Sequence, residues 1–307
     1  MTPEGTAINR IRVAAEIAES KGNALVVAYS GGKDSDVLLE LATRSGVPFR
    51  VEHNFTTADA PPTVYHIRRV FGRLAATGIP CKINFPDEIR TIDGKIRRAS
   101  MWNLIPKHGL PPTRKMRYCC RHLKERRFEN QHLMFGIRWD ESTSRDNRGT
   151  HETLAKKKEN RLTANEDDGQ LSFFGDNRAD ARLTEVCAAK GQIVTNPIID
   201  WSDGDVWKYA ELCGIEMNPL YRRAGFYRVG CVGCPMARKG VFRDFATFPA
   251  YKAAYLRAFG RMLEERKWRG PTTRLPWRTA EDVFNWWTDP KRVDGQMEMD
   301  FEEDLRL

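Results

Sequence analysis

A short polar stretch stands between an apolar run and a Leu-rich one. Its residues are Ser30, Gly31, Gly32, Lys33, Asp34 and Ser35. Glycines permit positive φ angles and close backbone approach, and the lysine and serines add a charge and hydroxyl donors. At a helix N-terminus such a turn directs backbone N–H groups and the positive end of the helix dipole at an anion. The spacing matches neither G-x-x-x-x-G-K-[ST] nor G-x-G-x-x-G. The stretch predicts a phosphate-binding loop of another kind, in preference to an ordinary glycine turn.

Cysteines form the second pattern with chemical meaning. Four of the seven are arranged as a Cys119-Cys120 pair followed by Cys231-x-x-Cys234. Adjacent cysteines are awkward for zinc, which favours two C-x₂₋₄-C knuckles, whereas four thiolates suit a [4Fe–4S] cluster. Zinc and a redox dithiol remain as alternatives, and Cys187 is open as a persulfide carrier. The tight Gly-rich turn at the second pair is expected to direct backbone N–H groups at cluster sulfurs.

Strands and helices alternate in the part of the sequence that must position these residues. β-Branched apolar runs predict strands, and the segments between them have helical spacing. The expected strands are 24–30, 47–55, 80–85, 132–138 and 192–199. The expected helices are 35–44, 62–76 and the segment 202–214, which Ser202 or Asp203 can cap. This order predicts an α/β fold, with a parallel sheet and helices on both of its faces, followed by a helical C-terminal region. The glycine stretch falls at the first strand-to-helix corner, where phosphates bind in such sheets.

Four ordered motifs resemble those of a known family. AYSGGKDSDVLL is similar to the signature of the PP-loop ATP pyrophosphatases, the adenine nucleotide α-hydrolase-like group with a Rossmann-like fold. The phosphoadenylyl-sulfate (PAPS) reductase branch is resembled by FGIRWDESTSR at 135–145, NPIIDWSDGDVWKY at 196–209 and NPLYRRAGFYRVGCVGCP at 218–235. The resemblance implies that the chain binds an adenine nucleotide, and in most branches ATP is cleaved between the α and β phosphates.

The resemblance also implies a set of site residues. The nucleotide-binding residues would be Ser30, Gly31, Gly32, Lys33, Asp34, Ser35 and Gly136, and the catalytic ones Lys33, Asp34, Arg138, Glu141 and Arg145. Arg138 and Arg145 can offer planar forks to phosphate or sulfate oxygens. Asp34 is expected to help hold Mg²⁺, and Glu141 to position an arginine or a divalent ion. A plain i,i+4 ion pair between Glu141 and Arg145 is the structural alternative.

The cysteine pattern is similar to that of the iron–sulfur adenylyl-sulfate reductases at all four positions. Those reductases, however, attack sulfur with a cysteine near the C-terminus, and this sequence has none after Cys234. The expected function is therefore ATP-dependent sulfur transfer, in which an oxygen is adenylated and sulfur displaces AMP. This is similar to the DNA phosphorothioation PP-loop subunit. It implies a cysteine desulfurase as sulfur donor, other subunits of a modification complex, and nucleic acid as acceptor, DNA in preference to tRNA. The alternatives are a reductase of adenylyl sulfate or PAPS that uses an external thiol, and a non-catalytic nucleotide and cluster sensor.

Charge is unevenly placed along the chain. The formal net charge is +9, and residues 95–127 hold eleven Lys or Arg and one acid, while 217–243 hold six and no acid. Both basic segments contain a cysteine pair, so a polyanion is expected on that side of the site. With few aromatic residues interleaved, contact with phosphates is favoured over base stacking. The acidic stretch 294–304 would dock a partner or fold back as a mimic of nucleic acid.

Domain organisation and location follow from composition. We expect a nucleotide-binding domain over 1–240 and a helical region with an acidic tail over 241–307. The polar segment 148–184 is expected to be a mobile insertion with a short ordered piece at 171–174. No apolar run approaches the roughly 18 residues of a membrane span, and no export signal is evident, so a cytoplasmic protein without a membrane partner is expected.

Overall fold

The computed structural model describes residues 2–125, 130–141, 148–153, 161–164, 171–174, 193–223, 225–237, 239–268 and 277–289. Its helices are α1 (Pro3–Ser20), α2 (Lys33–Ser45), α3 (Pro61–Ala76), α4 (Met101–His108), α5 (Tyr118–Leu123), α6 (Asp203–Leu212), α7 (Gly240–Thr247), α8 (Pro249–Trp268) and α9 (Ala280–Thr288). Its strands are β1 (Ala24–Ala28), β2 (Arg50–Asn54), β3 (Cys81–Asn84), β4 (Glu88–Arg90), β5 (Ile96–Arg98), β6 (Gln131–Met134), β7 (His151–Thr153), β8 (Arg161–Ala164), β9 (Leu171–Phe174) and β10 (Ile193–Thr195). Short 3₁₀ turns are η1 (Trp139–Glu141), η4 (Pro219–Arg222) and η5 (Pro235–Ala237).

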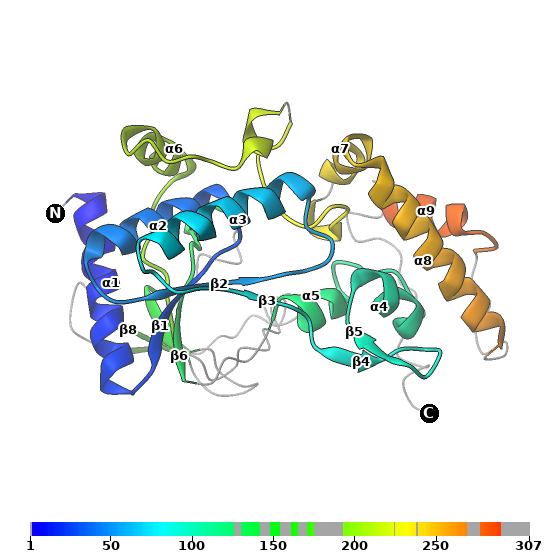
Figure 1. Ribbon diagram of the computed structural model, residues 1–307, viewed down its shortest axis with the longest axis horizontal. Coiled ribbons are helices and arrows are strands. Elements are labelled where there is room, and N and C mark those ends of the chain that lie inside the picture. The colour runs from blue at the N-terminus through cyan, green and yellow to red at the C-terminus, as the bar shows by residue number, and fades with distance from the viewer. Residues whose placement is uncertain are drawn as a thin grey trace. The chain divides into compact units, whose positions relative to one another are not determined.

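The main sheet has the strand order β3-β2-β1-β6-β10-β7-β8-β9 (Figure 1). The first five strands are parallel, and β7, β8 and β9 extend them in antiparallel fashion. β1 lies in the middle of the parallel part, with Val27 paired to Val51 on one side and to Met134 on the other. Its carboxyl end therefore lies where the chain order reverses, which is where open α/β sheets bind ligands.

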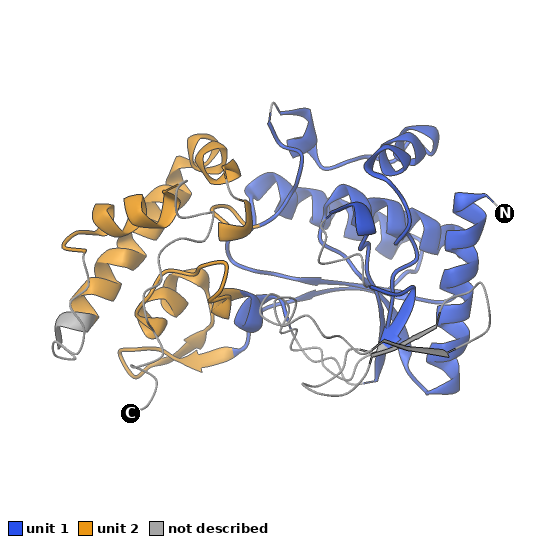
Figure 2. Cartoon of the chain, turned by 180° about the vertical axis from the view of Figure 1, so that it is seen from behind, with its two compact units in different colours: residues 1–87, 120–230 blue, residues 88–119, 231–307 orange. Residues whose placement is uncertain are grey.

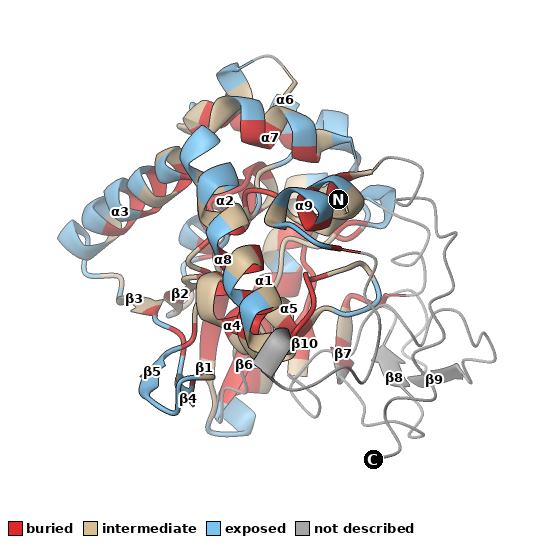
Figure 3. Cartoon of the chain, turned by 90° about the vertical axis from the view of Figure 1, so that its right-hand side faces the viewer, coloured by how far each residue is buried: buried red, intermediate tan, exposed pale blue. Residues whose placement is uncertain are grey.

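The main hydrophobic core lies between this sheet and helices α1, α2, α3 and α6. α1 and α2 each contact β1 and also contact each other, and α6 packs on α2. Along α2, Val37, Leu38 and Leu41 are fully buried. Figure 3 shows the buried residues gathered on the strands and on the helix sides that face them. A helix buried this firmly gives its N-terminus a fixed position, which a binding loop requires.

The chain forms two compact units (Figure 2). Unit 1 contains Met1–Asp87 and Cys120–Gly230, and it holds the main sheet. Unit 2 contains Glu88–Cys119 and Cys231–Leu307. In unit 2, α8 packs against α4, α7 and α9, and the β4–β5 hairpin precedes α4. Aromatic rings fill its interior, among them Tyr255 and Trp287, whose centroids are 4.7 Å apart.

The α/β class, the largely parallel sheet and the helical C-terminal region are confirmed. β1, β2, β3 and β10 lie within predicted strands, and β6 overlaps the predicted strand 132–138 but begins one residue earlier. Ser202 caps α6 as expected by accepting from the Asp205 N–H at 3.1 Å. The compact units differ from the predicted domains in composition, because 88–119 groups with the C-terminal residues. In the segment 148–184, the described residues include β9 at the predicted place, and also β7 and β8. Within the described part of the chain, no helix is long and apolar enough to cross a membrane.

Candidate functional site

The glycine stretch joins the end of β1 to the first turn of α2. The Ser35 hydroxyl closes the turn: it accepts from the Gly32 N–H at 3.1 Å and donates to the Gly32 carbonyl at 2.8 Å. The Ser30 hydroxyl donates to Ser35 Oγ at 3.1 Å. Gly31 has a φ of 72°, and a Cβ there would lie 2.9 Å from Ile67. The predicted loop at a helix N-terminus is thus confirmed as a structure, with glycine required at Gly31.

Two distant segments of unit 1 hold this loop. Asn218 is fully buried and donates to the Gly31 carbonyl at 2.8 Å and to Thr63 Oγ1 at 3.1 Å. On the other side, Gly136 lies against the backbone of Asp34, because a Cβ on Gly136 would be 2.8 Å from the Asp34 oxygen. The family-like segments that begin at 135 and 218 therefore both converge on the loop, although they are far from it in sequence.

Cations and carboxylates meet at the start of α2. Lys33 Nζ lies 3.1 Å from Asp34 Oδ2 and 2.9 Å from Asp203 Oδ1. Arg138 is 2 % exposed, and its Nε donates to Asp34 Oδ1 at 2.7 Å and its Nη2 to Asp203 Oδ1 at 2.9 Å. Arg138 Nη1 also lies 3.4 Å from Asp140 Oδ2. A nearly buried guanidinium requires such partners. The result is two cations linked through shared carboxylates.

The protonation states of Asp203 and Tyr221 follow from their surroundings. Burial opposes ionisation of Asp203, but the hydrogen bond and charge of Lys33, and then Arg138, outweigh it and lower the Asp203 pKa below its ordinary value. Asp203 is therefore a carboxylate at neutral pH. The Tyr221 hydroxyl accepts from the Lys33 backbone N–H at 3.1 Å, and burial raises the pKa of Tyr221, so this hydroxyl stays protonated.

Behind the loop lies a buried polar triad. The Tyr29 hydroxyl donates to Asp36 Oδ1, and His66 Nε2 is 3.0 Å from the same oxygen. All three side chains are nearly or fully buried. Tyr29 directly follows β1, Asp36 lies in the first turns of α2 and His66 is on α3, so the triad ties together the three elements that carry the loop.

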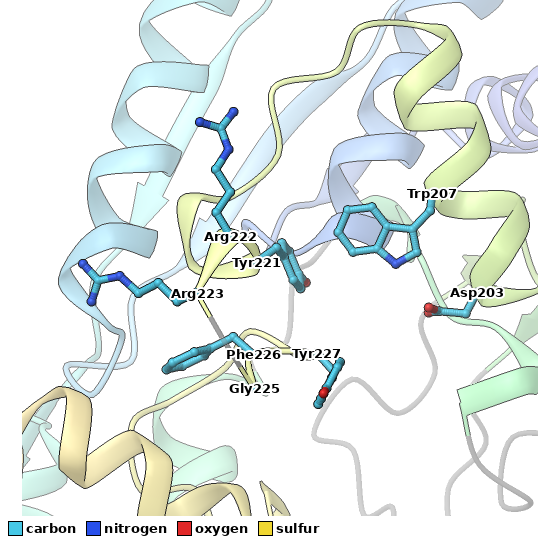
Figure 4. Close-up of a pocket in the computed structure, with 8 residues that line it drawn as sticks. All are labelled: Asp203, Trp207, Tyr221, Arg222, Arg223, Gly225, Phe226 and Tyr227. Carbon is cyan, nitrogen blue, oxygen red and sulfur yellow. The ribbon is translucent and has the colours of Figure 1, made fainter.

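A pocket of about 460 Å³ opens beside the network in unit 1. Its lining residues are Asp203, Trp207, Tyr221, Arg222, Arg223, Gly225, Phe226 and Tyr227 (Figure 4). Because Tyr221 and Asp203 both also contact Lys33, the pocket adjoins the loop directly.

The cysteine pattern lies largely in unit 2. Tyr255 is fully buried there, and its hydroxyl donates to the Val232 carbonyl at 3.0 Å. Burial, and then the charges of Cys231, Cys119 and Cys234, raise the pKa of Tyr255 above its ordinary value. The division between the units falls between Cys119 and Cys120, so Cys119, Cys231 and Cys234 belong to unit 2 and Cys120 belongs to unit 1.

The turn between Cys231 and Cys234 has the expected tight form. Gly233 has a φ of 72°, and a Cβ there would lie 2.6 Å from Phe245 Cζ. Its N–H donates to Asp244 Oδ2 at 3.3 Å, so this N–H is not directed at a sulfur as the sequence suggested. Among the residues described, no three His, Cys, Asp or Glu side chains are grouped closely enough to hold a single metal ion. Three thiols beside a Gly-tightened turn fit a soft metal cluster in their chemistry.

The structure thus brings most of the predicted residues of unit 1 together. The loop residues, Gly136 and Arg138 meet, whereas Arg145 and Cys187 lie outside the described residues. Glu141 is exposed, and its carboxylate accepts from the Arg138 backbone N–H at 3.4 Å. Sequence reasoning missed Asp203, Asp140, Tyr221, Asn218 and the triad behind the loop. For Tyr221 and Asn218 the signal was present, since both belong to the NPLY motif.

The loop and the two segments that converge on it all lie within a match to one protein family. The family model described as "Phosphoadenosine phosphosulfate reductase domain" matches residues 24–237. An uncharacterized protein of Methanocaldococcus jannaschii is 25 % identical over 234 residues, which are 74 % of this chain and 45 % of that protein. The adenosine 5'-phosphosulfate reductase of Allochromatium vinosum is 24 % identical over 220 residues, 70 % of this chain and 69 % of that enzyme. The adenosine 5'-phosphosulfate reductase of Burkholderia cepacia is 37 % identical over 60 residues, which are 20 % of this chain and 24 % of that enzyme. The chain therefore spans less than half of the first and third of these relatives.

The solved structures that match this chain are remote from it in sequence. The phosphoadenylyl-sulfate reductase of Candida auris has a TM-score of 0.43 and 16 % identity, covering 75 % of this chain and 88 % of that one. The U34-tRNA thiolase NcsA of Methanococcus maripaludis, solved with its [4Fe-4S] cluster, has a TM-score of 0.33 and 10 % identity, covering 87 % and 82 %. The match to residues 24–237 decides the assignment: the chain belongs to the phosphoadenosine phosphosulfate reductase domain family.

Proposed function

We propose that this protein cleaves ATP to AMP and pyrophosphate, and that it uses the energy to adenylate an oxygen on a nucleic acid for replacement by sulfur. One observation carries the first part of the proposal. Lys33 and Arg138 share the carboxylates of Asp34 and Asp203 at the N-terminus of α2, directly after the glycine loop. Charged forks and a helix N-terminus together are a site for a polyphosphate.

The proposed reaction balances as two displacements. An oxygen of the acceptor attacks the α-phosphorus of ATP, the bond to the α–β bridging oxygen breaks, and pyrophosphate leaves. The sulfur of a persulfide, delivered by a partner cysteine desulfurase, then attacks the adenylated centre, and AMP departs with the original oxygen. A thiol reductant cleaves the remaining S–S bond. Lys33 and Arg138 would stabilise the negative charge that develops on the departing pyrophosphate.

The balance of charge in the network supports a requirement for Mg²⁺. Three carboxylates, those of Asp34, Asp140 and Asp203, surround two cations. A polyphosphate entering this network would meet an excess of negative charge unless a divalent ion accompanied it. Mg²⁺ is usually bound by one or two carboxylates together with substrate phosphate oxygens, so Asp34 and Asp203 would hold it, and it would neutralise the phosphate oxygens.

We further propose that Cys119, Cys120, Cys231 and Cys234 hold a [4Fe–4S] cluster. The presence of Cys119, Cys231 and Cys234 in one unit supports it, as does the hydrogen bond by which the Tyr255 hydroxyl holds the Val232 carbonyl between the second cysteine pair. When bound, the cluster would supply a soft, sulfur-rich centre that can carry electrons or sulfide. The protein's own contribution is the turn that Gly233 permits, which sets the spacing of Cys231 and Cys234.

The net charge of +9 and the basic residues around both cysteine pairs support a nucleic-acid acceptor, with DNA favoured over tRNA. Such a reaction would be carried out with the other subunits of a modification complex. The runner-up function is reduction of adenylyl sulfate or PAPS by an external thiol, which the reductase relatives favour.

One experiment separates the two functions. Protein purified without oxygen would be incubated with ATP, and separately with adenylyl sulfate and a thiol reductant, each with and without DNA. AMP and pyrophosphate that increase with DNA, in the absence of sulfite, are the expected result. Sulfite formed from adenylyl sulfate would establish the reductase and overturn the proposal.

A further inference from the structure

The pocket beside the loop has aromatic walls that remain accessible. The rings of Trp207 and Tyr221 meet edge to face with their centroids 5.2 Å apart. Trp207 is 38 % exposed and Tyr227 is 83 % exposed, although both line the same pocket. Figure 4 shows the rings of Trp207 and Tyr221 next to one another at the pocket. Accessible aromatic faces in a pocket are a platform on which a flat ring can stack, and every nucleobase offers such a face.

Basic side chains flank the pocket without entering it. Arg222 and Arg223 line its rim and are exposed, and Arg228 is exposed one residue beyond Tyr227. In Figure 4 the guanidinium groups of Arg222 and Arg223 point away from the aromatic rings. A single nucleotide with its base stacked on the exposed ring faces would leave these cations unused. A strand that continues in both directions would bring its neighbouring phosphates to them.

We propose that this pocket holds one unstacked base of a nucleic-acid strand, with the flanking phosphates bound by Arg222 and Arg223. The proposal rests on the proposed function, because it identifies the acceptor as a strand with a displaced base. It also changes one expectation. The sequence favoured phosphate contacts over stacking because aromatic residues were sparse in the basic segments, but Tyr227 lies within 217–243 and is the most exposed large hydrophobic residue in the described part of the chain.

The position of the pocket indicates how a bound base would contribute to the reaction. Tyr221 lines the pocket with its ring and accepts from the Lys33 N–H with its hydroxyl. A base stacked there would hold the strand's backbone next to the phosphate-binding loop. Base stacking would thus position the acceptor oxygen for adenylation without reading the sequence by hydrogen bonds, since all bases stack.

The test is binding of a short fluorescein-labelled single-stranded DNA, followed by fluorescence anisotropy over a range of salt concentrations. Tyr227→Ala and Trp207→Ala are each expected to weaken binding by about tenfold, since a stacking contact of this kind contributes on the order of 1–3 kcal/mol. Tyr227→Phe should bind like the wild type, because it keeps the ring. Tyr65→Ala, which removes a 68 % exposed tyrosine from α3, is the matched control and should leave binding unchanged.

The arginines give a second, independent readout. Arg222→Gln and Arg223→Gln should each reduce the slope of log K against log salt by about 0.7, the value for one phosphate contact on a single strand. Tyr227→Ala should change the affinity but not this slope. Unchanged slopes in both arginine variants would contradict the assignment of the phosphates.

Measuring ATP cleavage by the same variants separates this inference from the proposed function. Oligonucleotide binding that is insensitive to Tyr227→Ala and Trp207→Ala, or absent in the wild type, overturns the pocket assignment even if ATP is cleaved. A higher KM for ATP in Tyr227→Ala with unchanged oligonucleotide binding assigns the pocket to the adenine of ATP and also overturns it. Binding that depends on Tyr227 while no AMP forms supports the pocket and rejects the proposed reaction.

Discussion

Replacing Gly136 by alanine should separate the loop from the segment that carries Arg138. A Cβ at this position would lie 2.8 Å from the backbone carbonyl oxygen of Asp34, 2.9 Å from the carbonyl carbon of Asp34 and 3.2 Å from the Cβ of Asp34. Two of these atoms are backbone, so they cannot rotate away as the end of a side chain can. Their segments follow β6 and β1, which are paired through Met134 and Val27. Either the loop or the residues before Arg138 must therefore move by some tenths of an ångström.

The cost of such overpacking is about 1–3 kcal/mol in the free energy of unfolding. For a unit of this size each kcal/mol lowers Tm by about 2–4 °C, so Gly136→Ala should lose several degrees. Because the shift falls between Asp34 and Arg138, pyrophosphate release should also slow by at least about tenfold. Thermal unfolding and pyrophosphate release would be measured on the same preparation.

Gly72→Ala is the matched control. Gly72 is exposed within α3, and a Cβ there meets nothing within 4 Å. The same substitution should therefore stabilise the helix by about 0.5–1 kcal/mol and leave the rate unchanged. A Gly136→Ala protein with the Tm and the rate of the wild type would refute the close approach of the two segments.

Four other predictions concern charge, metal and pH. Lys33→Ala should abolish pyrophosphate release while leaving Tm within a few degrees; release at the wild-type rate would remove Lys33 from the site. Asp203→Asn should raise the Mg²⁺ concentration needed for half-maximal release, and an unchanged Mg²⁺ dependence would show that Asp203 does not hold the ion. Cys231→Ser should lose the brown colour and most of the iron and acid-labile sulfide of the anaerobic protein, and a colourless wild type containing zinc would reverse the cluster assignment. Burial lowers the pKa of both His132 and His151 to about 4, so the folded state keeps them neutral. Their contribution to the free energy of unfolding is fully present above about pH 6.5. It falls as the pH drops toward 4, by up to about 1.4 kcal/mol per pH unit for each histidine. In denaturant unfolding of His132→Gln, the free energy of unfolding should depend less on pH between about 4 and 6.5 than in the wild type. An equal pH dependence would contradict this prediction.

The loop could be predicted because its signals are local. Two glycines, a lysine and hydroxyls between an apolar run and an amphipathic helix specify a strand, a turn and a helix N-terminus without reference to any other part of the chain. The same holds for Ser202, whose capping role depends only on the residue three positions later. Strand lengths were overestimated, as at 192–199, where the ladder ends at Thr195 and the backbone turns.

The partners of the loop could not be predicted from local patterns. Asp203 was interpreted as a residue of a helix start, which accounts for an aspartate there without any contact to Lys33. Tyr29, Asp36 and His66 each fit an ordinary strand or helix position, and only the packing of β1, α2 and α3 brings them together. Pairings over such separations are set by the tertiary fold, so a single sequence does not specify them.

For a related reason, the sequence did not indicate which segments make up each compact unit. Residues 88–119 follow the third strand directly and look like a continuation of the α/β pattern, but α4 packs on α8. Trp102, for example, lies edge to face with Tyr255 at a centroid distance of 5.1 Å. A helix whose apolar face has no partner nearby in sequence finds one far along the chain, and this could be seen only in the structure.

The most direct test of the central claim is to follow the γ-phosphate of ATP. Anaerobically purified protein would be incubated with γ-labelled ATP, Mg²⁺, DNA and a sulfur donor, with Lys33→Ala in parallel, and the labelled products would be separated. Cleavage between the α and β phosphates predicts that the label appears in pyrophosphate, and that this product is lost in Lys33→Ala. Label released only as orthophosphate, or retained in intact ATP at the level of Lys33→Ala, would contradict the account.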